Sequence, residues 1–215
     1  MKITVIGSGN MGRGIGYRLV AGGNDVTVVD RNLEAAETLA KELKGVAKNG
    51  STVKSTPFEK VELGEVVVLA VWYGANLEVA KALGDKLKGK VVVDIANPLN
   101  STYDGLVTAP GTSSAEELAK VVPAGAKVVK AFNTTFAGTL VTGNVGGTPL
   151  DVFVAGEDEA AKKTVLKLVA EGGLVGVDVG PLLRARELES LAFLGITLQM
   201  RHNLGFATGW KLIRP

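Results

Sequence analysis

The chain has 215 residues, a length typical of one α/β domain, and its 46% of hydrophobic residues can form a large core. Its 24 basic and 22 acidic residues are scattered along the sequence, which argues against a nucleic-acid groove or a membrane-binding patch. It contains no cysteine and one histidine, His202, so disulfides, thiolate catalysis and metal sites built on cysteine or histidine are excluded.

No apolar run reaches the ~18 residues that a membrane span needs. The first expected strand begins at residue 2, which leaves no room for a signal peptide. The sequence therefore predicts a cytoplasmic protein that has no membrane or nucleic-acid partner and binds no metal.

Residues 1–12, MKITVIGSGNMG, combine a short apolar strand at 2–6 with a turn of the form G-x-G-x-x-G. A helical pattern follows the turn. In such a turn the first glycine permits the sharp bend, the second lets a pyrophosphate reach the backbone, and the third lets the helix lie close to the sheet. The amides and the dipole at the start of the helix favour the phosphates. We therefore expect a dinucleotide-binding loop made of Gly7, Ser8, Gly9, Asn10, Met11 and Gly12.

A second strand, residues 25–29, leads into Asp30, which lies 18 residues after Gly12, close to the ~20 expected for an acid that binds the adenosine ribose. A carboxylate there accepts hydrogen bonds from the ribose hydroxyls and repels a 2′-phosphate, which favours NAD. The next residue, Arg31, can pair with a 2′-phosphate, which favours NADP. The two residues therefore point to different nucleotides.

Strands and helices alternate along the rest of the chain. Strands are expected at 52–54, 65–71, 91–95, 127–132, 151–155 and 174–179, and helices at 33–43, 76–87, from 113 or 114 to before Pro123, 158–171 and 184–203. The pattern predicts a doubly wound, mostly parallel Rossmann-type α/β sheet with a C-terminal helical cap. Residues 1–180 would form the NAD(P)-binding domain, and residues 181–215 a helical extension that packs on it or on a dimer partner.

Three of the expected strands carry unusual residues at their ends: Val71-Trp72, 95–98 with Ala96 and Asn97, and 132–137 with Phe136 and Ala137. In open α/β sheets, ligands bind beyond the carboxyl ends of the strands. These corners are therefore expected to line the nicotinamide half of the cofactor and its reaction partner.

The expected C-terminal helix is nearly all apolar between residues 190 and 200, and the tail after it adds Phe206, Trp210, Leu212 and Ile213. A helix that is apolar on all sides must be covered on more than one side. Its cover could come from the sheet and the tail or from a second subunit, so homodimerisation through this region is a hypothesis.

The segments VIGSGNMGRGIGYRLVAGG, KVVKAFNTTFA and DVGPLLRARELESLAFL together resemble the NADPH-dependent reductases of the deazaflavin coenzyme F420. They also resemble the cytosolic reductase domain of the membrane-bound metalloreductases. The likeness covers nearly the whole chain in the same order. It implies hydride transfer between NADP(H) and a deazaflavin or flavin such as coenzyme F420.

By this resemblance residues 8–11 would hold the pyrophosphate and Arg31 would meet the adenosine ribose or its phosphate. The nicotinamide would be flanked by Val71, Trp72, Asn97, Phe136 and Ala137. The family usually has a small residue where this chain has Asp30. The resemblance therefore favours NADP, and Asp30 keeps NAD open.

Hydride transfer between two cofactors needs little from side chains, since the cofactors carry the reactivity. No catalytic residue is therefore expected. Tyr73 and Tyr103 are the candidate proton donors, but packing or loop roles are favoured for both. Lys130 is assigned to a strand edge or an ion pair, and His202 to the surface or a helix end.

Other functions are compatible with the same fold. One is the reduction of a small imine or oxo substrate by NAD(P)H. Such enzymes usually carry a larger substrate domain than the roughly 30 residues that follow Pro181. The other is a non-catalytic module that senses NAD(P)H.

Overall fold

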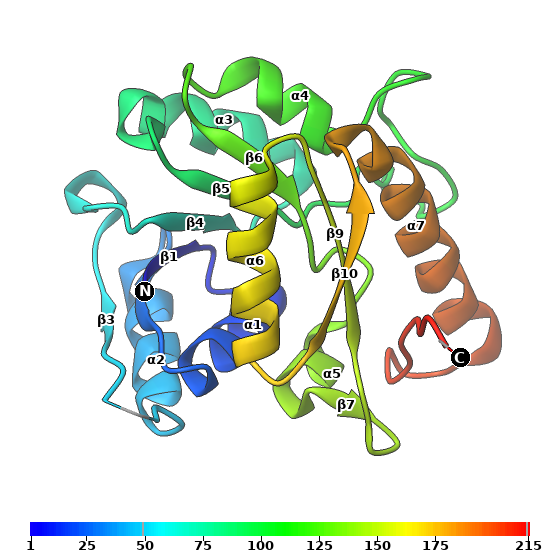
Figure 1. Cartoon of the computed structure of the whole chain (residues 1–215), viewed down its shortest axis with the longest axis horizontal. Coiled ribbons are helices and arrows are strands. Elements are labelled where there is room, and N and C mark those ends of the chain that lie inside the picture. The colour runs from blue at the N-terminus through cyan, green and yellow to red at the C-terminus, as the bar shows by residue number, and fades with distance from the viewer. Residues whose placement is uncertain (49, 214) are drawn as a thin grey trace.

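The computed structural model describes residues 1–48, 50–213 and 215. Within them, an eight-stranded sheet has the order β10-β9-β6-β5-β4-β1-β2-β3 (Figure 1). Its strands are β1 (Lys2–Ile6), β2 (Asp25–Val29), β3 (Val53–Ser55), β4 (Val66–Leu69), β5 (Val91–Asp94), β6 (Lys127–Lys130), β9 (Asp151–Gly156) and β10 (Val175–Gly180). The strands from β1 to β6 run parallel, whereas β9 is antiparallel to β6 and β10 follows the direction of β9.

The order in which the chain adds strands reverses at β1, which lies between β2 and β4. From β1 the chain passes outward through β2 and β3, and then returns to the other side of β1 to form β4 and the later strands. This is the switch point at which open α/β sheets bind their ligands. The predicted doubly wound Rossmann-type fold is confirmed.

Helices cover both faces of the sheet (Figure 1). They are α1 (Asn10–Ala21), α2 (Leu33–Lys44), α3 (Tyr73–Leu83), α4 (Ser114–Val121), α5 (Ala137–Thr142), α6 (Glu159–Glu171) and α7 (Ala185–His202). Short 3-10 turns lie at η1 (Phe58–Lys60), η2 (Gly84–Leu87) and η3 (Leu182–Arg184). Among the helices of the described residues, none combines the length and apolar character that crossing a bilayer requires.

Each face of the sheet has its own apolar core. Helices α1, α2 and α6 pack on one face and contribute Ile15, Leu43 and Val165, among others. Helices α3 and α4 pack on the other face and contribute Leu83 and Leu118. The middle strands are buried on both sides, which explains why they appear in the sequence as continuous apolar runs and not as alternating ones.

Several element boundaries differ from the predicted ones. Strand β4 ends at Leu69, and α3 already begins at Tyr73. Strand β6 ends at Lys130, and the chain turns soon after it because Phe132 takes a left-handed conformation with φ 63°. Helix α5 and the hairpin of β7 (Asn144–Val145) and β8 (Thr148–Pro149) were not predicted, since such short elements carry no periodic signal.

Helix α7 lies beside β10 at one end of the sheet, and the C-terminal tail folds back against it (Figure 1). The amide of Gln199 donates to Thr208, and Lys211 pairs with Asp151 of β9. A Cβ atom at Gly195 would lie 3.1 Å from the indole nitrogen of Trp210, so the tail packs closely on this part of the helix. The tail therefore supplies part of the cover that the apolar helix needs.

The contact between α1 and α5 provides a test of the packing. Gly14 faces α5 so closely that an added Cβ atom would lie 2.8 Å from the carbonyl oxygen of Ala137 and 2.9 Å from Cβ of Leu140. Gly14→Ala should therefore lower the free energy of unfolding by about 1–3 kcal/mol, the usual cost of overpacking. Thermal and urea unfolding measure the effect.

The matched control lies on the facing helix. A Cβ atom at Gly138 would meet nothing within 4 Å. Gly138→Ala should leave stability unchanged or raise it by up to ~1 kcal/mol through helix propensity. Equal stability of the Gly14→Ala variant and the native protein would show that α1 and α5 do not approach as described.

Candidate functional site

The glycine turn lies at the switch point of the sheet, between the end of β1 and the start of α1. Gly7 has φ 107°, a conformation that favours glycine. A Cβ atom at Gly7 would overlap the carbonyl oxygen of Ala70, next to the end of β4, and one at Gly12 would overlap the carbonyl oxygen of Gly7. These close approaches between backbone segments fix the shape of the turn.

Gly9 differs from its neighbours because it faces open space. It is the N-cap residue of α1, and a Cβ atom there would meet nothing within 4 Å. No side chain caps the helix, and its first turn holds no acidic residue. The first amides of α1 are therefore available to an anion, as a phosphate site at a helix N-terminus requires.

Asp30, which directly follows β2, stabilises the glycine turn through hydrogen bonds. Its Oδ2 accepts hydrogen bonds from the main-chain N–H and the hydroxyl of Ser8, at 2.7 and 2.8 Å, and its Oδ1 accepts one from the N–H of Asn32. Burial alone would raise the pKa of Asp30, but the hydrogen bonds from Asn32 and Ser8 outweigh it and the pKa lies below its ordinary value. Arg31 follows as an exposed residue and forms no ion pair within the part of the chain that the structure describes.

A cavity of about 460 Å³ opens where the carboxyl ends of β5 and β6 meet α1, α5 and α7. It is lined by Met11, Ile95, Asn97, Tyr103, Asn133, Thr135, Phe136, Ala137, Ile196, Met200 and Phe206. The rings of Phe136 and Phe206 meet edge to face, with centroids 5.3 Å apart. The lining is apolar apart from a few amides and hydroxyls, and among the residues that line it only Tyr103 can titrate.

Two asparagines at the strand ends are locked together in the wall of this cavity. The Asn97 amide donates to the Asn133 carbonyl at 2.9 Å, and the Asn133 amide donates to Asn97 Oδ1 and to the carbonyl of Leu188, both at 3.0 Å. Because both of its N–H groups are used, the Oδ1 atom of Asn133 is identified as the oxygen, and it has no partner within the described residues. Asn133 is only 4% exposed, so this oxygen is a buried acceptor beside the cavity that the described residues leave without a hydrogen bond.

The structure brings some of the predicted site residues to the cavity and places others around it. Met11, Asn97, Phe136 and Ala137 line it. Ala96 lies behind it, where its N–H donates to Asp94.

The two residues predicted after β4 lie apart from the cavity wall. Val71 packs beside Gly7, since a Cβ atom added at Gly7 would lie 3.3 Å from Cγ1 of Val71. Trp72 is 76% exposed and does not line the cavity. The predicted contacts of these two residues with nicotinamide stay predictions.

Other residues that the sequence singled out have clear positions. The Tyr73 hydroxyl donates to Glu117 at 2.7 Å, and burial, this hydrogen bond and the nearby charge of Glu117 raise the pKa of Tyr73 to about 12, in keeping with a packing role. His202 is the exposed last residue of α7. Lys130 was expected at a strand edge or in an ion pair, and the ion pair is confirmed; β6 is not an edge strand, because it lies between β5 and β9.

The sequence did not indicate that α7 and the tail would contribute to the cavity. Ile196 and Met200 of α7 and Phe206 of the tail form its far wall. From their apolar character the sequence predicted only that these residues pack against another part of the chain or against a second subunit. Tyr103, which the sequence assigned to packing or a loop, also reaches the cavity.

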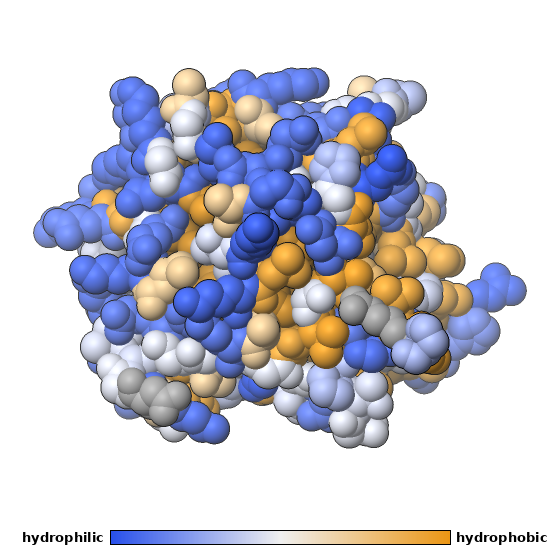
Figure 2. All heavy atoms as spheres, viewed as in Figure 1, coloured by the Kyte–Doolittle hydropathy of each residue, from blue (hydrophilic) through white to orange (hydrophobic). Residues whose placement is uncertain are grey.

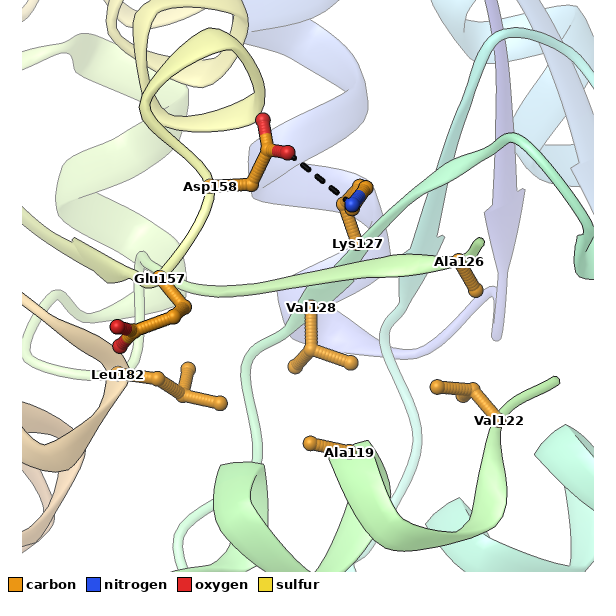
Figure 3. A pocket seen from close by; sticks show the side chains of 8 residues that line it. All are labelled: Ala119, Val122, Ala126, Lys127, Val128, Glu157, Asp158 and Leu182. Carbon is orange, nitrogen blue, oxygen red and sulfur yellow. Dashed lines mark ion pairs between the residues drawn. The ribbon is translucent and has the colours of Figure 1, made fainter. Parts of the chain in front are cut away.

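A second cavity, of about 390 Å³, lies elsewhere on the sheet (Figure 3). Figure 3 shows the apolar side chains of Ala119, Val122, Val128 and Leu182 around it, with Lys127 and Asp158 joined by an ion pair of 3.2 Å. Lys127 begins β6, so this cavity lies at the amino end of that strand. Since ligands of open α/β sheets bind at the carboxyl ends, the candidate site is the cavity beside the glycine turn.

A family model described as "NADP oxidoreductase coenzyme F420-dependent" matches residues 2–98. The F420-dependent NADP reductase of Methanocaldococcus jannaschii is 31% identical over 211 residues, and the match covers 94% of each chain. The metalloreductase STEAP3 of Rattus norvegicus is 33% identical over 190 residues, which are 88% of this chain and 36% of that protein.

A solved structure from Arthrobacter sp. FB24, described as a candidate F420-dependent NADP reductase, has a TM-score of 0.83 at 31% identity over 100% of both chains. The family resemblance seen in the sequence is confirmed. The chain belongs to the F420-dependent NADP reductase family and is an NAD(P)-dependent oxidoreductase.

Proposed function

We propose that this protein transfers a hydride between NADP(H) and coenzyme F420. The observation that carries the proposal is the cavity of about 460 Å³ beside the glycine turn. It is apolar, and Tyr103 is the only titratable residue among the described residues that line it. An enzyme that reduces a carbonyl or an imine usually needs a proton donor at the reacting atom. Hydride transfer between two ring systems needs them held close together, and the cofactors supply the chemistry.

The nucleotide half of NADP(H) fits the turn and the start of α1. The open space at Gly9 admits a pyrophosphate close to the first helical amides. Asp30 is already occupied with Ser8 and Asn32, so its carboxylate holds the turn in shape, and the exposed Arg31 is available for a 2′-phosphate. This arrangement supports NADP as the nucleotide, with NAD as the alternative that Asp30 keeps open.

The remaining residues of the cavity would orient the rings and exclude water. The unpartnered Oδ1 of Asn133 can accept a hydrogen bond from a carboxamide such as that of nicotinamide. Phe136, Phe206 and Met200 supply the apolar surface against which flat rings pack. The second ring would enter from the side of α7. A flavin in place of the deazaflavin is the alternative acceptor.

The C-terminal region supports a proposal about assembly. Within the described residues, exposed apolar side chains gather on α7 and the tail, including Leu194, Met200, Phe206, Leu212 and Ile213. Figure 2 shows apolar side chains massed over the face formed by β10 and α7. Large exposed apolar patches mark interaction sites, and we propose that a second copy of this chain covers this one.

The proposed division of the chain follows from the same region. Residues 1–180 would form the nucleotide-binding domain, and residues 181–215 the extension that closes the cavity and carries the dimer contact. The expected cytoplasmic location stays a prediction of the sequence.

The proposal is tested by NADPH oxidation with a panel of acceptors, for the native protein and for Gly9→Asp. The native protein should oxidise NADPH with coenzyme F420 faster than with FMN, a ferric chelate, small oxo acids or imines. Gly9→Asp should abolish nucleotide binding, because its carboxylate would occupy the space of the pyrophosphate and repel it. Titration calorimetry and steady-state absorbance measure the two effects.

Gly9→Ala is the graded control, because a single methyl group adds bulk without charge. Both variants should unfold near the native temperature, since a Cβ atom added at Gly9 meets no protein atom within 4 Å. Turnover of an imine or oxo acid in preference to F420 would replace the proposal with the small-substrate reductase. Tight NADPH binding without turnover of any acceptor would replace it with a sensing module.

The choice between NADP and NAD depends on Arg31. Arg31→Gln should weaken NADPH binding roughly 10- to 100-fold, since hydrogen bonds to charged groups are worth about 1.5–3 kcal/mol. It should leave NADH binding within about twofold, because NADH has no 2′-phosphate for the guanidinium to bind. Arg13→Gln is the matched control, because Arg13 already pairs with Glu42, with Nε 2.7 Å from the carboxylate. An equal loss of both affinities in Arg31→Gln would show that Arg31 does not read the 2′-phosphate.

The dimer is tested with Leu194→Lys. Leu194 is 50% exposed on α7, and a lysine there would place a charge in an apolar contact. Light scattering should give the native protein twice the mass of one chain and the variant the mass of one. Leu33→Lys, at an exposed apolar residue that begins α2, should stay dimeric. A monomeric native protein would contradict the proposal.

A further inference from the structure

A cluster of three charged side chains is buried behind the candidate site. Lys130 Nζ lies 2.9 Å from Oδ2 of Asp94 and 2.7 Å from Oε1 of Glu189. None of the three side chains is more than 1% exposed. The third donor of the ammonium group is used by the carbonyl oxygen of Ala96, so each Lys130 donor has an acceptor.

The cluster joins elements that are far apart in the sequence. Asp94 ends β5, Lys130 ends β6, and Glu189 lies on α7. Oδ1 of Asp94 also accepts from the amide of Asn76 on α3, at 2.8 Å, and Oε2 of Glu189 accepts from the N–H of Ser114 at the start of α4, at 3.1 Å. The three side chains therefore tie both strand ends and three helices to one point.

This point is linked directly to the wall of the cavity. Ala96 donates to Asp94 and accepts from Lys130, and it is followed by Asn97, which faces the cavity. On the other side Leu188, the residue before Glu189, accepts the hydrogen bond of Asn133. The same helix then continues to Ile196 and Met200, which form the opposite wall. Lys130 and Glu189 thus hold both walls of the cavity.

Stability alone does not explain such a cluster. Burying ions costs several kcal/mol for each, and apolar side chains of the same volume often serve a core equally well. Burial raises the pKa of Glu189 above its ordinary value even though Lys130 opposes the shift. Buried polar networks in which each member is bonded fix one arrangement of the surrounding elements, and here that arrangement includes the cavity.

We propose that the Asp94–Lys130–Glu189 cluster is a positioning device that fixes α7 against the strand ends and so sets the width of the cavity in which the two rings meet. The inference rests on the proposed function, since it assumes that a nicotinamide ring enters this cavity. None of the three side chains lines the cavity, so they act through Asn97, Asn133 and the apolar residues of α7.

The first test uses Glu189→Gln. Glutamine keeps the shape of the side chain, but its NH₂ group cannot accept a hydrogen bond, so the link to Lys130 or the link to Ser114 is lost. The rate of hydride transfer in a single turnover should fall roughly 10- to 100-fold, because small misplacements of reacting rings cost about that much. Affinity for adenosine 2′,5′-bisphosphate, which has no nicotinamide, should stay within about twofold of the native value.

A readout that needs no acceptor is the fluorescence of bound NADPH, which reports the surroundings of the nicotinamide ring. Glu189→Gln should change this emission toward that of free NADPH. The matched control is Arg184→Gln, which breaks an exposed ion pair with Glu187 of α7, with Nη1 and Oε1 2.6 Å apart. Exposed pairs of this kind contribute little, so rate and emission should stay native.

Asp94→Asn neutralises the other carboxylate of the cluster, leaves Lys130 paired with Glu189 and changes no residue of the cavity wall, so it decides the question if Glu189→Gln fails to fold. It should show the same slow transfer with native affinity for the bisphosphate. A folded variant with native rate and emission overturns the proposal, and so does an equal loss of rate and bisphosphate affinity, which would indicate a general structural role. Absence of NADPH oxidation by the native protein would overturn the proposed function, and the emission of bound NADPH would still decide this inference.

Discussion

The close approach of the glycine turn to the end of β4 is the constraint on which the rest of the site depends. A side chain at Gly7 would overlap the backbone at Ala70, and one at Gly12 would overlap Gly7 itself. With both contacts in place, α1 begins directly beyond β1 and its first amides point past Gly9. Asp30 then holds Ser8 from the neighbouring strand. The shape of the proposed pyrophosphate site is thus set by backbone contacts, before any side chain of the cavity is considered.

The sequence predicted the parts of the fold that depend on neighbouring residues. The first strand, the glycine turn and the start of α1 lie within a dozen residues, and the spacing of the glycines defines them. The buried strands were visible because residues such as Val66 to Leu69 are apolar on both faces. The ends of β4 and β6 were placed too late, because apolar residues continue past each strand and the turn at Phe132 depends on a backbone angle that composition does not reveal.

The cavity was less predictable, since it is formed by contacts between distant segments. Asn133 bonds to Leu188 and Phe136 meets Phe206, and no spacing rule brings such residues together. Strand-end reasoning identified one wall, with Asn97, Phe136 and Ala137, because the topology of the sheet places strand ends at one edge. The other wall comes from α7, and the sequence indicated only that this helix required cover.

The distribution of charge around the site suits the proposed hydride transfer between two rings. The cavity wall is nearly free of titratable groups, whereas the charged side chains Asp94, Lys130 and Glu189 lie behind it. Their hydrogen bonds go to one another, to Asn76 and to the backbone. A general acid or base in the wall would serve a reaction that moves protons to a substrate, but ring-to-ring hydride transfer gains most from distance and orientation. In this chain the charged side chains fix the positions of the cavity walls, and the walls themselves are apolar. This arrangement meets the need for a fixed distance and orientation of the two rings.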